Sequence, residues 1–233
     1  MLSKAEAVIY LANQRGCSEA AWFRSFYTFN FGEFKRESRT PFGSLIAVNE
    51  HTLKEGRTLS FSHPDSLKVL LIPITGALNY SYGNAEKSVD VGQASYVTLQ
   101  PGVPLELSNS YLSNSIRFMH GNLGIEDETF AERDVICTFD LASDHSELSA
   151  LRTESDELFY VWRLCGRQDV VCQRKIPHSG FFVYQISGTC EVSGRLLLPG
   201  DALSLMNVET VEFESLTQEA IVFVAEVPFP NPC

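Results

Sequence analysis

Histidine is the residue type of this sequence best suited to hold a metal or carry a proton, because neutral imidazole binds transition metals and titrates near neutral pH. The chain has five of them: His51, His63, His120, His145 and His178. Only His63 and Asp65 have ligand spacing, on either side of one residue, and we interpret the other four histidines as isolated structural or solvent-facing residues. Since a catalytic metal takes about three protein ligands, the sequence assembles no complete metal site locally.

Serine and cysteine give no sign of nucleophilic catalysis. The sequence contains no G-x-S-x-G, no G-x-G-x-x-G and no phosphate-binding P-loop. The six cysteines show no C-x-x-C pair and no repeated spacing: Cys17, Cys137, Cys165, Cys172, Cys190 and Cys233. Disulfide frameworks are typical of short secreted chains. We therefore expect reduced thiols that mostly pack as small core residues, with Cys165 and Cys172 unlinked.

The charge balance restricts the class of partner. There are 18 Lys and Arg against 29 Asp and Glu in 233 residues, which gives a net charge of −11. Binding to a nucleic-acid backbone needs clustered basic side chains, which this composition does not favour. No apolar run approaches the roughly 20 residues that span a bilayer, and the first ten residues lack the order of a signal peptide. We expect an acidic cytoplasmic protein with no direct nucleic-acid partner and no membrane partner.

The elements that must position any site are predicted to be strands almost throughout. Short apolar or alternating runs are separated by Gly, Pro, Asn and Asp, which is typical of an all-β sandwich or barrel. Only residues 4–13 and 144–151 have the pattern of short helices. The predicted strands are Trp22–Phe31, Ser44–Val48, Val69–Ile74, Ala94–Leu99, Phe159–Leu164, Phe181–Ile186, Ala202–Met206 and Ile221–Val227.

The two halves of the chain resemble each other. The stretch around Gly76, VLLIPITGALNY, is similar to the stretch around Gly188, FFVYQISGTCEV, 112 residues later. In each half a second glycine, Gly92 or Gly200, opens a further strand. The same order of strand, glycine bend and strand, written twice, predicts a duplicated β-domain with Gly76 and Gly188 at equivalent bends.

Motifs in the first half resemble those of pirins and pirin-like bicupins. The similarity extends over roughly residues 10–118, and afterwards only the internal repeat supports it. The matching motifs are Gln14-Arg15-Gly16, the aromatic run from Trp22 to Gly32, Phe42-Gly43 with Val48-Asn49-Glu50, Tyr82-Gly83-Asn84, and Gln100-Pro101-Gly102. The resemblance implies two cupin domains, which are jelly-roll β-barrels, in tandem, and we place them at residues 1–120 and 121–233. It also implies a metal in the first domain, usually iron, with which some members oxidise flavonols such as quercetin. Others act as regulatory cofactors or have no established activity.

The residues at the places that the resemblance assigns to metal ligands are not ordinary ligands. In a pirin the first motif has two histidines and a glutamate, and the second motif has a histidine with a glutamate two residues later. Counting back from Gly76, the first three places hold Ser62, Pro64 and Lys68, and the places of the second motif hold Leu107 and Asn109. A slip of one residue would bring His63 and Asp65 into the ligand places, but it would also reverse which side chains face inward, because the strand period is two. We therefore expect that the pirin metal site is absent.

The function expected from the sequence is that of a pirin-like bicupin with a degenerate metal site. It would be a non-catalytic protein in a regulatory or redox-responsive role, binding a small molecule or a protein partner. We expect no cofactor, and if one is bound, a transition metal such as iron in the N-terminal cupin. The alternative is a metal-dependent flavonol (quercetin 2,3-) dioxygenase with a displaced ligand set around His63 and Asp65. The residues expected in the pocket of the first barrel are Ser62, His63, Pro64, Asp65, Lys68, Leu107 and Asn109.

Overall fold

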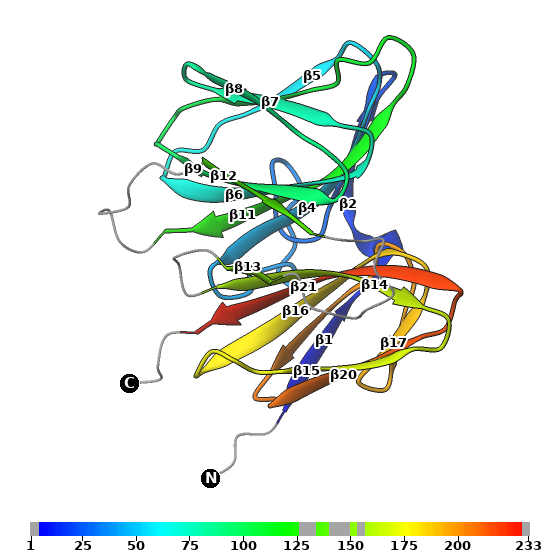
Figure 1. The fold of residues 1–233 in the computed structure, drawn as a ribbon. Coiled ribbons are helices and arrows are strands. Elements are labelled where there is room, and N and C mark those ends of the chain that lie inside the picture. The colour runs from blue at the N-terminus through cyan, green and yellow to red at the C-terminus, as the bar shows by residue number, and fades with distance from the viewer. Residues whose placement is uncertain (1–4, 126–133, 140–149, 153–156, 230–233) are drawn as a thin grey trace. The chain divides into compact units, whose positions relative to one another are not determined.

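The computed structural model describes residues 5–125, 134–139, 150–152 and 157–229, and these residues are almost entirely β-strand. The chain forms two compact units (Figure 1). Residues 16–139 form one unit, called here the first barrel, and residues 1–15 with 140–233 form the other, the second barrel. Within the described ranges the one helix is a 3-10 turn, η1 (Ala12–Gln14), and no helix there is long and apolar enough to cross a membrane. The predicted all-β fold is confirmed.

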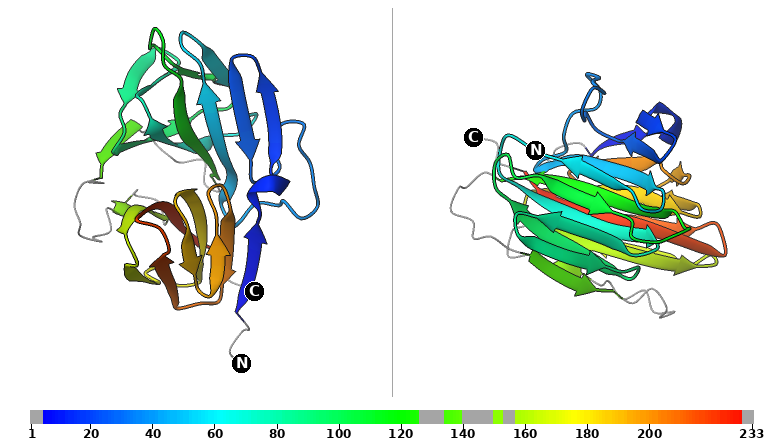
Figure 2. Two further views of the ribbon diagram at one scale, coloured as in Figure 1. Left: turned by 90° about the vertical axis from the view of Figure 1, so that its right-hand side faces the viewer. Right: turned by 90° about the horizontal axis from the view of Figure 1, so that it is seen from above.

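The first barrel consists of a seven-stranded and a four-stranded antiparallel sheet. The large sheet has the order β12-β9-β6-β11-β4-β3-β2, and its strands lie side by side in the right-hand view of Figure 2. Its strands are β2 (Gly16–Ala20), β3 (Phe23–Tyr27), β4 (Leu45–Leu53), β6 (Leu67–Thr75), β9 (Gln93–Leu99), β11 (Ile116–Gly124) and β12 (Asp134–Thr138). The small sheet has the order β5-β10-β7-β8, with β5 (Thr58–Phe61), β7 (Leu78–Tyr82), β8 (Ala85–Val89) and β10 (Leu105–Ser108).

The core of the first barrel lies between these two sheets. Alternate side chains of each strand point inward, as the period of two requires, so that Val69 and Leu71 of β6 meet Leu105 and Leu107 of β10 in one apolar cluster. On β4 and β11 the inward positions of this cluster include Leu53 and Phe118. The parity of these two residues fixes which other side chains of β4 and β11 face the interior.

The second barrel repeats this construction. Its six-stranded sheet has the order β1-β19-β16-β21-β14-β13, and its four-stranded sheet the order β15-β20-β17-β18. The strands of the larger sheet are β1 (Glu6–Tyr10), β13 (Ala150–Arg152), β14 (Leu158–Cys165), β16 (Ser179–Ser187), β19 (Ala202–Met206) and β21 (Glu219–Pro228). Those of the smaller sheet are β15 (Asp169–Gln173), β17 (Cys190–Val192), β18 (Arg195–Leu197) and β20 (Thr210–Ser215).

The predicted duplication is confirmed by the order of the strands. The central order β9-β6-β11-β4 of the first barrel corresponds to β19-β16-β21-β14 of the second, and β16 lies 112 residues after β6 along its whole length. Gly76 and Gly188 follow these two strands at equivalent bends, with φ of 75° and 68°. Glycine suits both bends because side chains strongly disfavour a left-handed φ.

The boundaries of the two units differ from the expected division at residue 120. Strand β1 pairs antiparallel with β19, so the N-terminal segment belongs to the second barrel, and the left-hand view of Figure 2 shows it in dark blue along that edge. Strand β12 pairs with β9 and extends the first barrel to residue 139. The helix predicted over residues 4–13 is therefore wrong, because Val8, Ile9 and Tyr10 are good strand formers and find a partner strand at this edge. Of the other predicted helix, residues 144–149 lie outside the described residues and residues 150–151 form part of β13.

The bend at Gly188 supports the first testable prediction. A Cβ atom there would meet the backbone of Glu219 and lie 2.6 Å from Cα of Ala220, whereas at Gly194, with φ of 75°, it would have no atom within 4 Å. We expect Gly194→Ala to lower the free energy of unfolding by about 1 kcal/mol through backbone strain alone, and Gly188→Ala by about 2 kcal/mol, because a clash with backbone is added. Urea unfolding followed by the fluorescence of Trp162 measures both. Equal stability of the two variants would contradict the close approach.

Candidate functional site

Four polar side chains face the interior of the first barrel from β4 and β11. Asn49 and His51 have the inward parity of Leu53, and His120 and Asn122 have that of Phe118. The antiparallel register places Asn49 opposite His120, so that an Asn-x-His run on one strand lies beside a His-x-Asn run on the next. All four are buried, with exposed fractions of 0 to 6%. We call these four residues, Asn49, His51, His120 and Asn122, the polar quartet.

Most hydrogen-bonding atoms of the polar quartet have no partner within the chain. His51 Nδ1 shares a hydrogen bond of 2.7 Å with Ser25 Oγ of the adjacent strand β3. By contrast, His51 Nε2, His120 Nδ1, Asn122 Oδ1 and both amide atoms of Asn49 are buried without a hydrogen bond. Each such atom costs on the order of 1–3 kcal/mol, and nearly all buried polar groups in proteins are satisfied. The unpartnered atoms of these four side chains are concentrated on two neighbouring strands, which makes this wall a candidate for contact with a bound group.

The two histidines of the quartet are held in the neutral form. Their ring centroids are 5.6 Å apart, and Phe61 stands 5.4 Å from His51 and 5.1 Å from His120. Burial lowers the pKa of His120 to about 4, against an opposing interaction with Asn122. Burial, and then the charge of His120, hold the pKa of His51 well below its usual value. At neutral pH each ring therefore offers one nitrogen as donor and one as acceptor.

Two members of the quartet line a cavity of about 460 Å³ in the first barrel. His120 and Asn122 form its polar wall, and Phe31 and Phe61 contribute aromatic rings. Lys35 is the one charged side chain among the described residues that line the cavity, and it is exposed. The complete lining is Asn30, Phe31, Gly32, Lys35, Ser60, Phe61, Ser62, His63, Leu67, Val69, Leu99, Leu105, His120 and Asn122.

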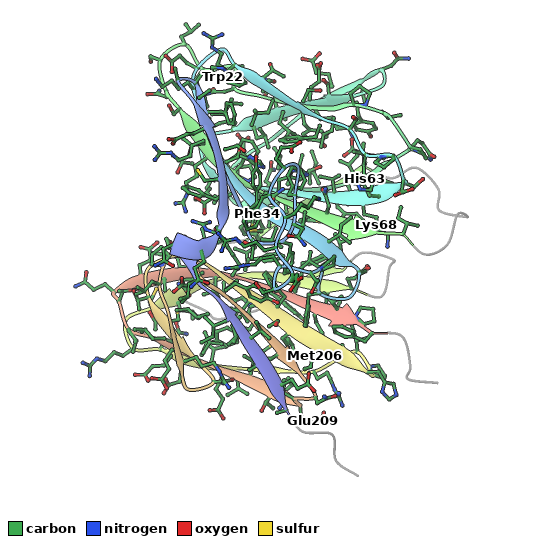
Figure 3. The ribbon with its side chains drawn as sticks, turned by 180° about the vertical axis from the view of Figure 1, so that it is seen from behind. Trp22, Phe34, His63, Lys68, Met206 and Glu209 are labelled. Carbon is green, nitrogen blue, oxygen red and sulfur yellow. The ribbon has the colours of Figure 1, made fainter. Side chains whose placement is uncertain are left out.

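Two of the seven residues predicted for the pocket line this cavity. Ser62 and His63 lie in the loop that precedes β6, and Figure 3 labels His63 there. Pro64 and Asp65 belong to the same loop but are exposed and are not among the lining residues. His63 Nδ1 accepts a hydrogen bond of 3.2 Å from the backbone N–H of Asp65, so these two residues make a local loop contact.

The other three predicted residues lie elsewhere, each for a clear reason. Lys68 of β6 has the parity opposite to the inward-facing Val69, so its side chain is on the other face of the large sheet. Leu107 is fully buried in the apolar cluster. Asn109 follows β10, and its amide donates to the backbone oxygens of Leu53 at 3.0 Å and of Asn114 at 2.7 Å. It fixes a turn and does not face the cavity.

These placements decide whether the implied pirin metal fits. Pro64 has no donor atom in its side chain, Leu107 supplies only carbon, and the amide of Asn109 is already hydrogen-bonded. Lys68 would bring a cation. Among the described residues no three of His, Cys, Asp and Glu come together as a metal would require. The residues at the places assigned by the resemblance do not fit the metal.

The interpretation of His51 and His120 as isolated residues is wrong. They are 69 positions apart in sequence, and only the pairing of β4 with β11 makes them neighbours. One signal was available in the sequence. Asn49 and His51 share the parity of the apolar Leu53 on one strand, and His120 and Asn122 share that of the apolar Phe118 on the other. Polar residues on the buried parity of a strand mark a candidate site.

At the described positions that correspond to the polar quartet, the second barrel has different residues. The offset of 112 maps Leu71 of β6 onto Val183 of β16, and Val224 stands opposite Val183 as His120 stands opposite Leu71. By the same registers the places of Asn49, His51, His120 and Asn122 are taken by Tyr160, Trp162, Val224 and Glu226. Large aromatic side chains fill this interior. One carboxylate oxygen of Glu226 accepts hydrogen bonds from the backbone of Lys175 and Ile176 and from Ser179, while His178 is exposed.

Known proteins share both the fold and a sequence signature with this chain. Residues 140–225 match the family described as the quercetinase C-terminal cupin domain. YhhW from Escherichia coli has a TM-score of 0.87 and 17% identity, over 98% of this chain and 100% of that chain. The bacterial pirin YhhW from Escherichia coli in complex with nickel(II) has a TM-score of 0.83 and 16% identity, over 97% and 100%. Quercetin 2,3-dioxygenase from Acinetobacter baumannii has a TM-score of 0.75 and 10% identity, over 97% and 87%.

No curated protein sequence matches the chain. At 10–17% identity the likeness to the solved structures concerns the fold. The match over residues 140–225, the duplicated barrels and this likeness agree on one assignment. The chain has the fold of two cupin domains in tandem, as these pirin structures do, and residues 140–225 match the quercetinase C-terminal cupin domain.

Proposed function

We propose that the protein is a non-catalytic cupin that binds a small molecule in the cavity of its first barrel without a metal. The observation that carries this proposal is the polar quartet with its unpartnered atoms, two members of which line a cavity of about 460 Å³. Ligand pockets of roughly this size, mostly apolar with a few convergent polar groups, are the usual form of small-molecule sites. Val69, Leu99 and Leu105 provide the apolar part.

The alternative, a flavonol dioxygenase with a displaced ligand set, has less support. Its ligands would be His63 and Asp65, whose side chains are 37% and 82% exposed and 3.9 Å apart. Within the described residues no third acidic or sulfur ligand joins them. The quercetin dioxygenase from Acinetobacter baumannii shares the fold at 10% identity, which carries no ligand set to this chain.

A redox-responsive role also has little support from the thiols. Burial raises the pKa of Cys172 to about 12 and that of Cys190 to about 11, with an added contribution from Glu226 at Cys172. Burial raises the pKa of Cys137 as well. A raised pKa keeps a thiol protonated and therefore poorly nucleophilic. Cys165 ends β14, and Cys172 is on β15 in the other sheet.

The metal-free part of the proposal is tested by expression with added iron, manganese and nickel, followed by elemental analysis. We expect less than about 0.1 metal ion per chain, since a transition metal needs about three fixed protein ligands. We also expect no loss of quercetin absorbance under air. Near-stoichiometric metal that disappears in His63→Ala would establish the displaced ligand set and overturn this part.

The binding part is tested with 1-naphthol, an uncharged aromatic probe, by calorimetry on the full chain. We expect saturable binding of one molecule per chain. Ser62→Trp places a large ring at the exposed rim of the cavity and should abolish binding, whereas Ser110→Trp, at an exposed residue away from the cavity, should leave it unchanged. Equal binding by the two variants would place the probe elsewhere and contradict the proposal.

A further inference from the structure

The walls of the cavity carry information about the charge of its ligand. His120 and Asn122 are the two buried polar side chains that line it, at 1% and 6% exposure. Neither carries a charge at neutral pH, because burial keeps His120 unprotonated. No carboxylate is among the described residues that line the cavity, and Lys35 is exposed. A buried charge without a partner is strongly disfavoured. The deep part of the cavity is therefore suited to an uncharged group.

The unpartnered atoms indicate which uncharged group fits. Asn122 Oδ1 is a hydrogen-bond acceptor without a donor, and His120 Nδ1 is buried without any partner. The two side chains are two positions apart on β11 and therefore point to the same face of the sheet. A ligand group that contacts one of them is within reach of the other. The neutral imidazole contributes a donor at one of its two nitrogens. A matching group needs an N–H for Asn122 beside an oxygen for the imidazole, and a carboxamide or lactam has both.

The rest of the cavity is suited to a flat ring. Phe31 and Phe61 both line it, with their ring centroids 5.9 Å apart at an interplanar angle of 68°, and both lie within about 6 Å of His120. Aromatic rings favour offset or edge contacts with another ring at such distances. Leu67 and Val69 add aliphatic surface.

We propose that the cavity recognises an uncharged aromatic or heteroaromatic ligand through a carboxamide or lactam group, which His120 and Asn122 bind at the polar wall. This inference rests on the proposed function, because it names the ligand class of the same cavity. Asn49 and His51 lie beyond these two residues and do not line the cavity. Their part is to make the wall behind His120 polar and neutral.

The test compares three compounds that share a ring system and nearly the same shape: 2-naphthamide, 2-naphthoate and 2-naphthamidine. Their head groups are neutral, anionic and cationic at pH 7. We expect the amide to bind the wild-type protein at least about tenfold more tightly than either charged analogue. It should also bind at least about tenfold more tightly than 1-naphthol, which lacks the paired donor and acceptor.

Asn122→Asp should reverse the ligand preference, because it keeps the shape of the side chain and adds a negative charge. We expect this variant to prefer 2-naphthamidine over 2-naphthamide at least about tenfold, while Asn79→Asp, on β7 and away from the cavity, keeps the wild-type preference. If Asn122→Asp fails to fold, Asn122→Leu serves in its place, and the amide should then lose its advantage over 1-naphthol.

The outcomes separate this inference from the proposed function. Equal or tighter binding of 2-naphthoate would show that Lys35 or His63 at the rim governs recognition, and the inference would be wrong while the cavity remained a binding site. Equal binding of 1-naphthol and 2-naphthamide would also contradict the inference that the ligand carries an amide, while the cavity would remain a binding site. If none of the compounds binds, both the inference and the proposed function are contradicted.

Discussion

Lowering the pH from 6.5 to 4 should destabilise the first barrel by about 3 kcal/mol through His120 alone. The pKa of this residue is about 4 in the folded protein because of burial, against an ordinary value of 6.5. Between these two values the unfolded chain binds a proton that the folded chain does not, so stability falls as the pH falls. A shift of one pKa unit corresponds to about 1.4 kcal/mol. The contribution is complete above pH 6.5 and fully lost below pH 4. His51 acts in the same direction.

The two tryptophans make this measurable for each barrel, since Trp22 belongs to the first barrel and Trp162 to the second. In a Trp162→Phe background, urea unfolding followed by Trp22 fluorescence at several pH values reports the first barrel. The double variant His51→Leu/His120→Leu should flatten the dependence between pH 6.5 and 4, and its stability at pH 7 should change little, because unsatisfied polar atoms are removed together with the hydrogen-bonding groups.

His63→Leu is the control for this experiment. His63 lines the same cavity, but its side chain is 37% exposed, so its removal should leave the pH dependence of wild type unchanged. An unchanged slope in the double variant would mean that other groups titrate in this range and that the buried pair is not the cause.

The sequence predicts the architecture far better than the site. Alternation, turn residues and the repeat around Gly76 and Gly188 are local signals, and they sufficed for the all-β class and the duplicated barrels. The sequence does not predict which barrel the N-terminal strand joins. Strand β1 pairs with β19, almost 200 residues away, and nothing within residues 6–10 indicates that partner. The amino-acid composition of a short segment is compatible with a strand or a helix until the partner strand is known.

The site was missed for the same physical reason. The ligand places that the resemblance assigns include Lys68, which lies on the outer face of the large sheet, and Leu107, which lies in the apolar core. The residues that face the cavity with unsatisfied atoms, His120 and Asn122, acquire their meaning from the register of β11 against β4. A local sequence motif carries no information about which distant strands pair.

Residues distant in sequence also meet around Asp134 of β12, whose hydrogen bonds connect the two sheets of the first barrel. Its carboxylate, 8% exposed, accepts hydrogen bonds from the hydroxyls of Tyr80 at 2.7 Å and Tyr82 at 2.9 Å, both on β7 of the small sheet. Ser95 of β9 donates to Tyr80 at 2.8 Å, and Lys87 of β8 reaches Asp134 at 2.9 Å. Burial raises the pKa of Tyr80, and Asp134 raises it further against the effect of Ser95, so the hydroxyl remains a donor.

Asp134→Ala should therefore lower the free energy of unfolding of the first barrel by about 3 kcal/mol, because it leaves two tyrosine hydroxyls and a half-buried ammonium without their acceptor. Asp134→Asn should cost less, about 1–2 kcal/mol, since an amide oxygen still accepts a neutral hydrogen bond. Glu106→Ala is the matched control. Its carboxylate also accepts from a β7 hydroxyl, that of Ser81 at 3.4 Å, but it is exposed, and its loss should change stability by less than about 0.5 kcal/mol. In the Trp162→Phe background, urea unfolding followed by Trp22 fluorescence measures all three variants. If Asp134→Ala were as stable as Glu106→Ala, the junction between β12 and β7 would be held by apolar packing and not by this carboxylate.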